Sequence, residues 1–266
     1  MIRALMFSLI GLTGTALAWD EARVPGGLAL IPVPENSRPM FMGRPVLTLK
    51  QDQTTVAVVG LALSLKPGEH RLQVDNEVIP FTVTGKRYLE QRIYLDNPRQ
   101  VNPNSLDLER IRGEASRQHD ALSEFQGSLD RLQFILPVNG PISSPFGKRR
   151  FFNDQPRRPH SGTDIAAPIG TPILASASGS VILVGDFFFN GRLVVIDHGE
   201  GVKTMYNHMD AIDVVEGQVI QQGEPIGTVG ATGRVTGPHL HFGVILNGAS
   251  IDPSLVVPEI RDLPGN

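Results

Sequence analysis

Cysteine is the most informative absence from this 266-residue sequence, which contains none. Disulfides therefore contribute nothing to its stability, and a structural zinc site, which usually takes its fourth protein ligand from cysteine, is not expected. A strongly basic composition is also missing: the formal net charge is -3, which argues against a nucleic-acid partner. With 41% hydrophobic residues, the chain is typical of a globular protein long enough for two modest cores.

Near its start the chain also lacks an apolar run of membrane-spanning length. The run at residues 4–12 is shorter than the roughly 20 residues that a spanning helix needs. It follows the basic Arg3 and precedes Ala16-Leu17-Ala18, a small-x-small cleavage pattern. Residues 1–18 are therefore predicted to be a secretory signal peptide, with no transmembrane segment after its cleavage and no lipid-attachment cysteine. The alternative is an uncleaved N-terminal anchor.

Short β-rich segments recur from about residue 25 to residue 94, and turn signals such as Lys66-Pro67-Gly68 and Asp75-Asn76 separate them. This pattern favours a small N-terminal β-sandwich over residues 19–100. The segment contains no catalytic constellation. His70 follows a Pro-Gly turn and is predicted to lie in a surface loop.

A helical linker is expected next, over residues 101–131. Asn104 and Ser105 offer an N-cap, and Asp107 stands where it favours the amides of the first turn. Apolar residues then recur at helical spacing, on one face, to about residue 125: Leu108, Ile111, Ala115 and Leu122. The charged opposite face, with His119, is predicted to be solvated.

The second domain, residues 132–266, shows short strand-like runs separated by many glycines and no convincing helix. This favours an antiparallel β fold in which a groove is floored by a sheet and walled by loops. A polar, basic loop at residues 148–158 is expected either to steer an anionic polymer or to be a plain solvated loop. His198 ends a strand at a turn and is interpreted as structural or as a surface residue, with a supporting role beside a metal left open.

Two histidine motifs in this domain point to a metal. His239 and His241 are separated by one residue and so share a face of any strand that contains them. Upstream, His160 and Asp164 stand four residues apart around Gly162, which lets the chain curl. One histidine of the pair together with His160 and Asp164 would form a three-ligand zinc site. Without cysteine, a fourth position open to water is expected.

The order of three motifs, HSGTD from His160, Tyr206-Asn207-His208 and TGPHLHF from Thr236, resembles that of the lysostaphin-type (LytM) zinc metallopeptidases, which cleave peptide cross-links in bacterial peptidoglycan. The resemblance runs from about residue 134 to residue 258. It implies Zn2+ as cofactor, His160, Asp164 and His241 as its ligands, and His208 and His239 as the catalytic pair. The N-terminal region is similar to the all-β module that often precedes such peptidases in exported Gram-negative proteins.

This set of groups suits hydrolysis of a peptide bond. Zinc held by two neutral imidazoles and one carboxylate lowers the pKa of a bound water toward ~7 and polarises a carbonyl group. The reaction also needs a group that accepts the proton of water and a donor for the oxyanion. His208 and His239 are the candidates, because no His-Glu-x-x-His helix supplies a glutamate. Which of the two is the base stays open.

The function expected is that of a secreted, periplasmic zinc metalloendopeptidase acting on peptidoglycan stem peptides. The family resemblance implies that it cleaves the bond between D-alanine and diaminopimelate. One alternative is a non-catalytic LytM-type activator of a cell-wall amidase, a class that usually lacks some zinc ligands. Another is a glycyl-glycine endopeptidase, which would more naturally carry a wall-targeting module. The N-terminal β domain is also expected to cover or narrow the groove, because two domains on one tether dock at small entropic cost.

Overall fold

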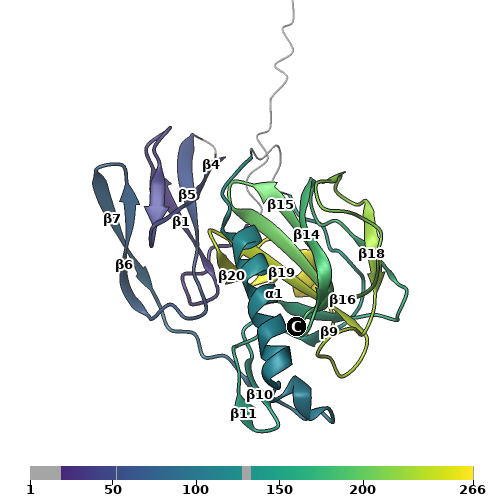
Figure 1. Ribbon diagram of the computed structural model, residues 1–266. Coiled ribbons are helices and arrows are strands. Elements are labelled where there is room, and N and C mark those ends of the chain that lie inside the picture. The colour runs from purple at the N-terminus through teal and green to yellow at the C-terminus, as the bar shows by residue number, and fades with distance from the viewer. Residues whose placement is uncertain (1–18, 52, 128–132, 266) are drawn as a thin grey trace, which may run out of the picture.

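The computed structural model describes residues 19–51, 53–127 and 133–265, and the signal peptide predicted for residues 1–18 lies outside them. The described chain is mainly β, as the sequence predicts, with a long helix between an N-terminal pair of sheets and a large antiparallel sheet (Figure 1). None of the helices in these three ranges is long and apolar enough to cross a membrane.

Two small sheets form the N-terminal part. The first has the order β1 (Leu28–Val33), β5 (Thr54–Gly60), β4 (Leu47–Gln51). The second has the order β3 (Arg44–Pro45), β2 (Pro39–Phe41), β6 (Gly68–Val74), β7 (Glu77–Val83). Alternate residues of these strands point inward and form an apolar cluster that includes Ile31, Val59, Leu72 and Phe81. The sandwich-like arrangement confirms the expected fold class of this region.

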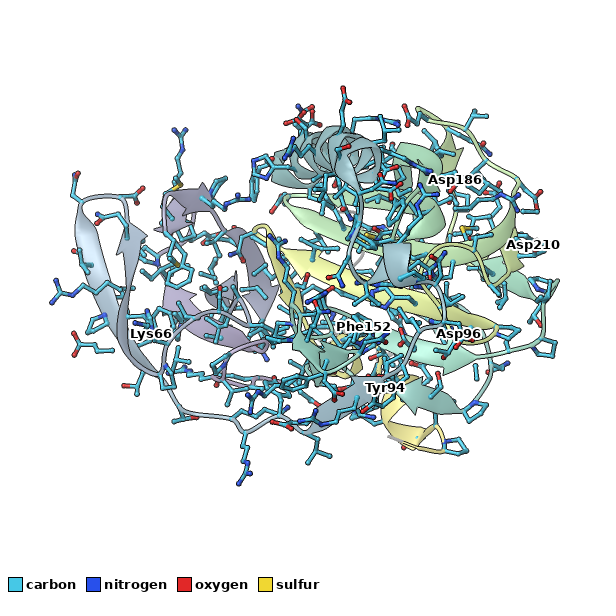
Figure 2. The ribbon with its side chains drawn as sticks, turned by 60° about the horizontal axis from the view of Figure 1, so that its bottom comes forward. Lys66, Tyr94, Asp96, Phe152, Asp186 and Asp210 are labelled. Atoms are coloured by element: carbon cyan, nitrogen blue, oxygen red, sulfur yellow. The ribbon has the colours of Figure 1, made fainter. Side chains whose placement is uncertain are left out.

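The chain then crosses to the second part and pairs with it. Strand β8 (Glu90–Ile93) lies parallel to β10 (Arg149–Phe152), which in turn forms a hairpin with β11 (Gln155–Pro156). The predicted basic loop is therefore a hairpin that pairs with the segment leaving the N-terminal sheets. In Figure 2, Phe152 at the end of β10 lies near the centre of the molecule, between Lys66 and Asp210 at opposite edges. The predicted domain boundaries near residues 100 and 131 remain a prediction.

Helix α1 (Ser105–Ser123) follows the short 3-10 helix η1 (Pro98–Gln100). Asn104 caps α1: its side chain accepts from the Asp107 amide at 2.9 Å, and the Asp107 carboxylate accepts from the Asn104 amide, which completes a capping box. The helix packs on the large sheet beside β14 (Gly179–Phe187), where Glu114 accepts from the Phe188 amide at 2.8 Å. The helix is thus a wall of the second part as well as a connection.

The large sheet has ten strands, all of whose pairings within it are antiparallel. Its main path is β17 (Val219–Ile220), β14, β15 (Gly191–Gly199), β16 (Val202–Ile212), β19 (His239–Leu246), β12 (Thr163–Ala166), β9 (Ile142–Ser144). Strands β13 (Pro172–Leu174), β18 (Pro225–Val229) and β20 (Ala249–Ile251) join it from the sides, and the 3-10 helix η2 (Pro253–Leu255) and helix α2 (Glu259–Asp262) follow. The expected antiparallel β fold is confirmed.

The two parts share one hydrophobic core. Leu28 and Val58 from the N-terminal sheet belong to the same buried cluster as Leu246 of β19. Beyond β19, the Asn247 side chain accepts from the Gly60 amide at 2.7 Å and donates to the Gly60 carbonyl at 3.2 Å. The C-terminal end of β19 is therefore anchored to β5.

His198 on β15 is a buried structural residue. Its Nδ1 donates to the Ser178 carbonyl at 2.8 Å, its Nε2 lies 2.8 Å from Thr204 Oγ1, and the ring meets Phe134 edge-on at 5.3 Å between centroids. Burial lowers its pKa to about 4. Because both ring nitrogens are satisfied within the core, the interpretation of His198 as structural agrees with its surroundings.

The lowered pKa of His198 predicts a pH-dependent stability. An unfolded histidine titrates near 6.5, so the unfolded chain binds more protons than the folded chain as the pH falls from about 6.5 to about 4. Above pH 6.5 His198 does not reduce the free energy of unfolding. As the pH falls from about 6.5 to about 4, that free energy decreases by about 3 kcal/mol in total. Denaturant unfolding at several pH values should show a shallower decline for His198→Gln than for wild type. Equal slopes would contradict the assignment.

Candidate metal centre

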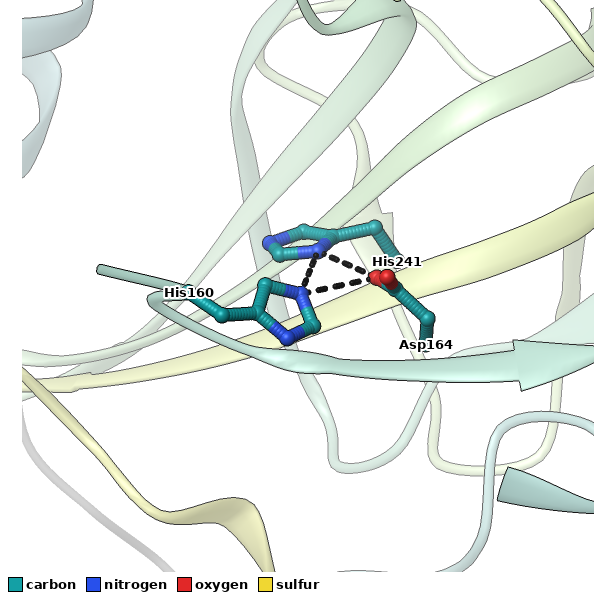
Figure 3. A group of neighbouring side chains, drawn as sticks. All are labelled: His160, Asp164 and His241. Atoms are coloured by element: carbon teal, nitrogen blue, oxygen red, sulfur yellow. Dashed lines mark hydrogen bonds and ion pairs between the residues drawn. The ribbon is translucent and has the colours of Figure 1, made fainter. Parts of the chain in front are cut away.

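Three of the predicted side chains meet at one point. Asp164 lies on β12 and His241 on β19, where the two residues are direct partners across the antiparallel pair, and His160 precedes β12 (Figure 3). His160 Nε2 lies 2.9 Å from Asp164 Oδ1 and 2.9 Å from His241 Nδ1, and His241 Nδ1 lies 2.8 Å from Asp164 Oδ1. All three residues are buried, and one donor atom from each lies within 4.8 Å of the others.

The surroundings fix the orientation of these side chains. His160 Nδ1 donates to the Pro145 carbonyl at 2.9 Å, which leaves Nε2 to face the other two residues. Gly162 leaves room for the His241 ring: a Cβ at this position would lie 2.7 Å from His241 Nε2 and 2.4 Å from the Phe242 carbonyl oxygen. The glycine of the HSGTD motif is thus required by close approach, not by the chain curl that the sequence suggested.

Charge at the centre is balanced by an arginine that the sequence did not single out. Arg150 Nη2 donates to Asp164 Oδ2 at 2.6 Å. Burial alone would raise the pKa of Asp164, but the hydrogen bonds and charges of His160 and His241 hold that pKa well below its usual value. Burial lowers the pKa of His160 to about 4, so this imidazole is neutral near pH 7. A carboxylate and a neutral imidazole are the protonation states that a metal ligand needs.

The remaining two predicted histidines lie beside this group. His208 is on β16 with φ of 66°, and its Nδ1 donates to the Thr232 carbonyl at 2.9 Å. His239 Nδ1 donates to the Gly237 carbonyl at 2.8 Å. The two rings lie 4.9 Å apart between centroids, and the His208 ring is 6.0 Å from that of His241. Within the described ranges neither Nε2 has a hydrogen bond, and that of His239 lies 3.7 Å from Asp164 Oδ1.

Two cavities adjoin the centre and share three lining residues, Arg150, His208 and Arg234. The smaller, about 100 Å³, is lined by Asp164, His208 and His239 and by Gln91 and Ile93 of β8. The larger, about 540 Å³, lies between the site and the face of α1 that carries Leu108 and Ile111, and His160, His208 and His241 also line it. The groove thus has a helix as one wall, where the sequence predicted only loops.

Neither cavity is lined by the two N-terminal sheets. From the predicted N-terminal domain, only Gln91, Ile93 and Leu95 reach the smaller cavity, and the larger is lined from Val101 onward. The cover expected from the N-terminal β domain remains a prediction, and the segment placed at the groove is the connection through β8, η1 and α1. His70 and His119 lie away from both cavities, and His119 is exposed on α1 as predicted. The surface loop predicted for His70 is wrong: this residue lies half-buried on β6, where its ring packs against Phe41 and Phe81.

Comparisons with known proteins agree with this geometry. Residues 158–253 match the model of peptidase family M23, and residues 21–86 match that of the peptidase family M23 N-terminal domain. Peptidoglycan DD-endopeptidase ShyA of Vibrio cholerae is 45% identical over 128 residues, which are 47% of this chain and 30% of ShyA. DD-carboxypeptidase/endopeptidase Mpg of Neisseria meningitidis is 46% identical over 122 residues, 45% of this chain and 28% of Mpg. The chain thus spans less than a third of either relative.

A crystal structure from Pseudomonas aeruginosa, assigned to peptidase M23, covers far more of the chain. It superimposes with a TM-score of 0.76 at 39% sequence identity, over 90% of this chain and 96% of that one. On these matches the chain belongs to peptidase family M23.

Proposed function

We propose that this protein is a zinc metalloendopeptidase that hydrolyses peptide cross-links in bacterial peptidoglycan, at the bond between D-alanine and diaminopimelate. The observation that carries the proposal is the convergence of His160, Asp164 and His241 on one point, beside two imidazoles whose Nε2 atoms form no hydrogen bond within the described ranges. The names of ShyA and Mpg, both endopeptidases, support the reaction. A substrate in the cell wall also supports export, with the periplasm as the compartment in a Gram-negative host.

The three side chains fit zinc by their chemistry. Two imidazole nitrogens and one carboxylate oxygen form a common ligand set of catalytic zinc sites, and a fourth position stays open to water. Zinc bound here would polarise a carbonyl group and lower the pKa of a water ligand. Arg150 occupies Asp164 Oδ2, so that Oδ1 alone faces the two imidazoles.

His208 and His239 supply the proton transfer and the hydrogen bond that hydrolysis needs. Both rings are held through Nδ1 by a backbone carbonyl, so their Nε2 atoms are fixed in orientation toward the reacting groups. Because Nδ1–H of each ring is already engaged, a neutral ring offers Nε2 only as an acceptor. One of the two would take the proton of the attacking water in this form, and the other would have to be protonated to donate a hydrogen bond to the oxyanion. The proposal leaves the assignment between them open.

The two alternative functions have weaker support. An amidase activator has no need of a complete set of ligands and neighbouring imidazoles, whereas all five are present and close together here. The names of ShyA and Mpg give no support to a glycyl-glycine endopeptidase, because neither name mentions a glycine substrate.

The reaction can be tested on intact sacculi. The full chain should cleave the cross-links of sacculi joined through diaminopimelate, so that muramidase digestion afterwards yields more monomeric and fewer dimeric muropeptides, and a chelator should prevent this change. Muropeptide mass spectrometry identifies the cleaved bond. Sacculi with glycine bridges serve as the second chemotype, and cleavage of these alone would support the glycyl-glycine alternative. No cleavage of either, with zinc bound, would support the activator.

Metal content is a second prediction. Wild type should bind about one zinc per chain, and His160→Ala should lose it, because two ligands hold zinc weakly. The fold should survive, since a large apolar core surrounds the sheet. Elemental analysis after gel filtration measures the metal, and circular dichroism checks the fold. His119→Ala, on the exposed face of α1, is the control and should bind zinc as wild type does. A wild type that takes up no zinc from excess would refute the site.

A third prediction separates His239 from His241. His241→Ala should lose both zinc and activity. His239→Ala should keep zinc and lose roughly 10²- to 10⁴-fold in rate, the usual contribution of a positioned proton-transfer group. The two variants must therefore differ more in metal content than in activity. Zinc kept in His241→Ala but lost in His239→Ala would exchange their roles.

A further inference from the structure

Arg234 is a partly buried cation without a counter-ion. Its guanidinium lies between two aromatic rings, 4.2 Å from the centroid of Phe152 and 4.1 Å from that of Phe189. Its only side-chain hydrogen bond within the described ranges is a long one, from Nη1 to the Gln100 carbonyl at 3.4 Å, and no carboxylate there forms an ion pair with it. The stacking holds the guanidinium plane in place but satisfies few of its five N–H donors.

Arg234 borders both cavities beside the candidate metal centre. Arg234, Arg150 and His208 line both cavities, so the guanidinium stands where the two cavities meet beside the candidate metal centre. The smaller cavity, of about 100 Å³, is lined by Arg234 together with Asp164 and His239, so a peptide that enters it with its scissile bond at the candidate ligands would lie beside Arg234. Arg234 is therefore close enough to contact the substrate next to the reacting bond.

The electrostatic surroundings add positive charge. Burial first, and then the charges of Arg150 and Arg157, together lower the pKa of Arg234 to about 10. Arg157 and Arg158 also line the larger cavity. Its one acidic lining residue, Glu114, is already engaged by Arg110 at 2.5 Å and by the Phe188 amide at 2.8 Å. The cavity thus has an excess of guanidinium groups.

The hydrogen-bond acceptors of Arg157 and Arg234 in this structure are neutral oxygens. Arg157 Nη2 donates to the Val101 carbonyl at 2.7 Å and to Gln155 Oε1 at 2.9 Å, and Arg234 reaches the Gln100 carbonyl. Both carbonyls come from the C-terminal end of η1, of which Gln100 is the last residue and Val101 the C-cap. Because a carboxylate is a stronger partner for guanidinium than an amide oxygen, an incoming carboxylate would improve on these contacts.

We propose that Arg234, supported by Arg157, binds a free carboxylate of the substrate peptide and so selects substrates that carry one beside the scissile bond. This inference rests on the proposed function and adds a specificity determinant to it. Two carboxylates of a cross-linked stem peptide have this chemistry: that of the diamino acid and that of the terminal residue. Peptides in which each is separately converted to a carboxamide distinguish the two.

Binding is measured first, on the protein without metal, so that the result does not depend on catalysis. Calorimetry with a short stem peptide should give a Kd about 10- to 100-fold lower for the free acid than for the matching carboxamide, the usual contribution of a hydrogen bond between charged groups. The difference should shrink as salt is added. Arg234→Gln should bind both peptides with the affinity that wild type shows for the carboxamide.

Two further variants control the experiment. Arg149→Gln removes a cation from the same hairpin as Arg150, but Arg149 pairs with Glu90 at 3.2 Å and lines neither cavity, so the preference for the acid should persist. Arg234→Lys keeps the charge without the fork of donors and should retain part of the preference. Circular dichroism checks that Arg234→Gln folds. If Arg234→Gln does not fold, the inference is still tested by the affinities of wild type and of Arg234→Lys for the acid and the carboxamide peptide.

The same peptides, made as cross-linked dimers, then test turnover by the zinc-loaded protein. The inference requires that kcat/KM favours the acid in wild type and that Arg234→Gln abolishes this preference. Equal binding of acid and carboxamide by wild type, or an undiminished preference in Arg234→Gln, would overturn it. Failure of the proposed function looks different: no dimer is cleaved by any variant, while the difference in binding is still measurable.

Discussion

The pairing of β12 with β19 is the constraint on which the site depends. In this register Asp164 stands opposite His241 and Ala166 opposite His239. Since side chains alternate along a strand, a slip of one residue would turn the two histidines of β19 away from Asp164. The register is held from the other face, where Ile165, Leu240 and Phe242 are fully buried. Burial of apolar residues on one face thus positions the polar residues on the other.

Local patterns predicted the polar face well, because each depends on short spacing. The pair His239 and His241 shares a face in any strand, and the four-residue step from His160 to Asp164 brings both to one end of β12. The sequence could not show that β8 would pair with β10, since parallel pairing across a long connection leaves no periodic signal. Arg150 and Arg234 were missed for that reason: their roles follow from contacts with residues far away in the sequence, and only the basic character of residues 148–158 was visible.

Two buried histidines, His198 near the end of β15 and His208 within β16, show what else the sequence could not decide. His198 and His208 are both buried and both keep a lowered pKa, about 4 and about 3, with burial as the main cause. His198 has a polar partner at each ring nitrogen. His208 uses only Nδ1 within the described chain, faces both cavities with the other edge of its ring, and has a φ that costs a non-glycine residue energy. An unsatisfied ring nitrogen beside a cavity, not burial, distinguishes the site residue from the structural one.

The N-terminal part supports the strands that carry the site, in addition to placing residues beside the groove. Strand β8 holds β10, and with it Arg150, which balances the charge of Asp164. Asn247 fastens the far end of β19 to Gly60, and Leu28 and Val58 complete the core beneath that strand. A chain cut near residue 133 would lose all of these contacts while it uncovers the groove. Its activity would therefore report two opposite effects, loss of support and gain of access. Changes confined to the groove face of α1, at Leu108 or Ile111, alter access while they leave β8, Asn247 and the shared core in place.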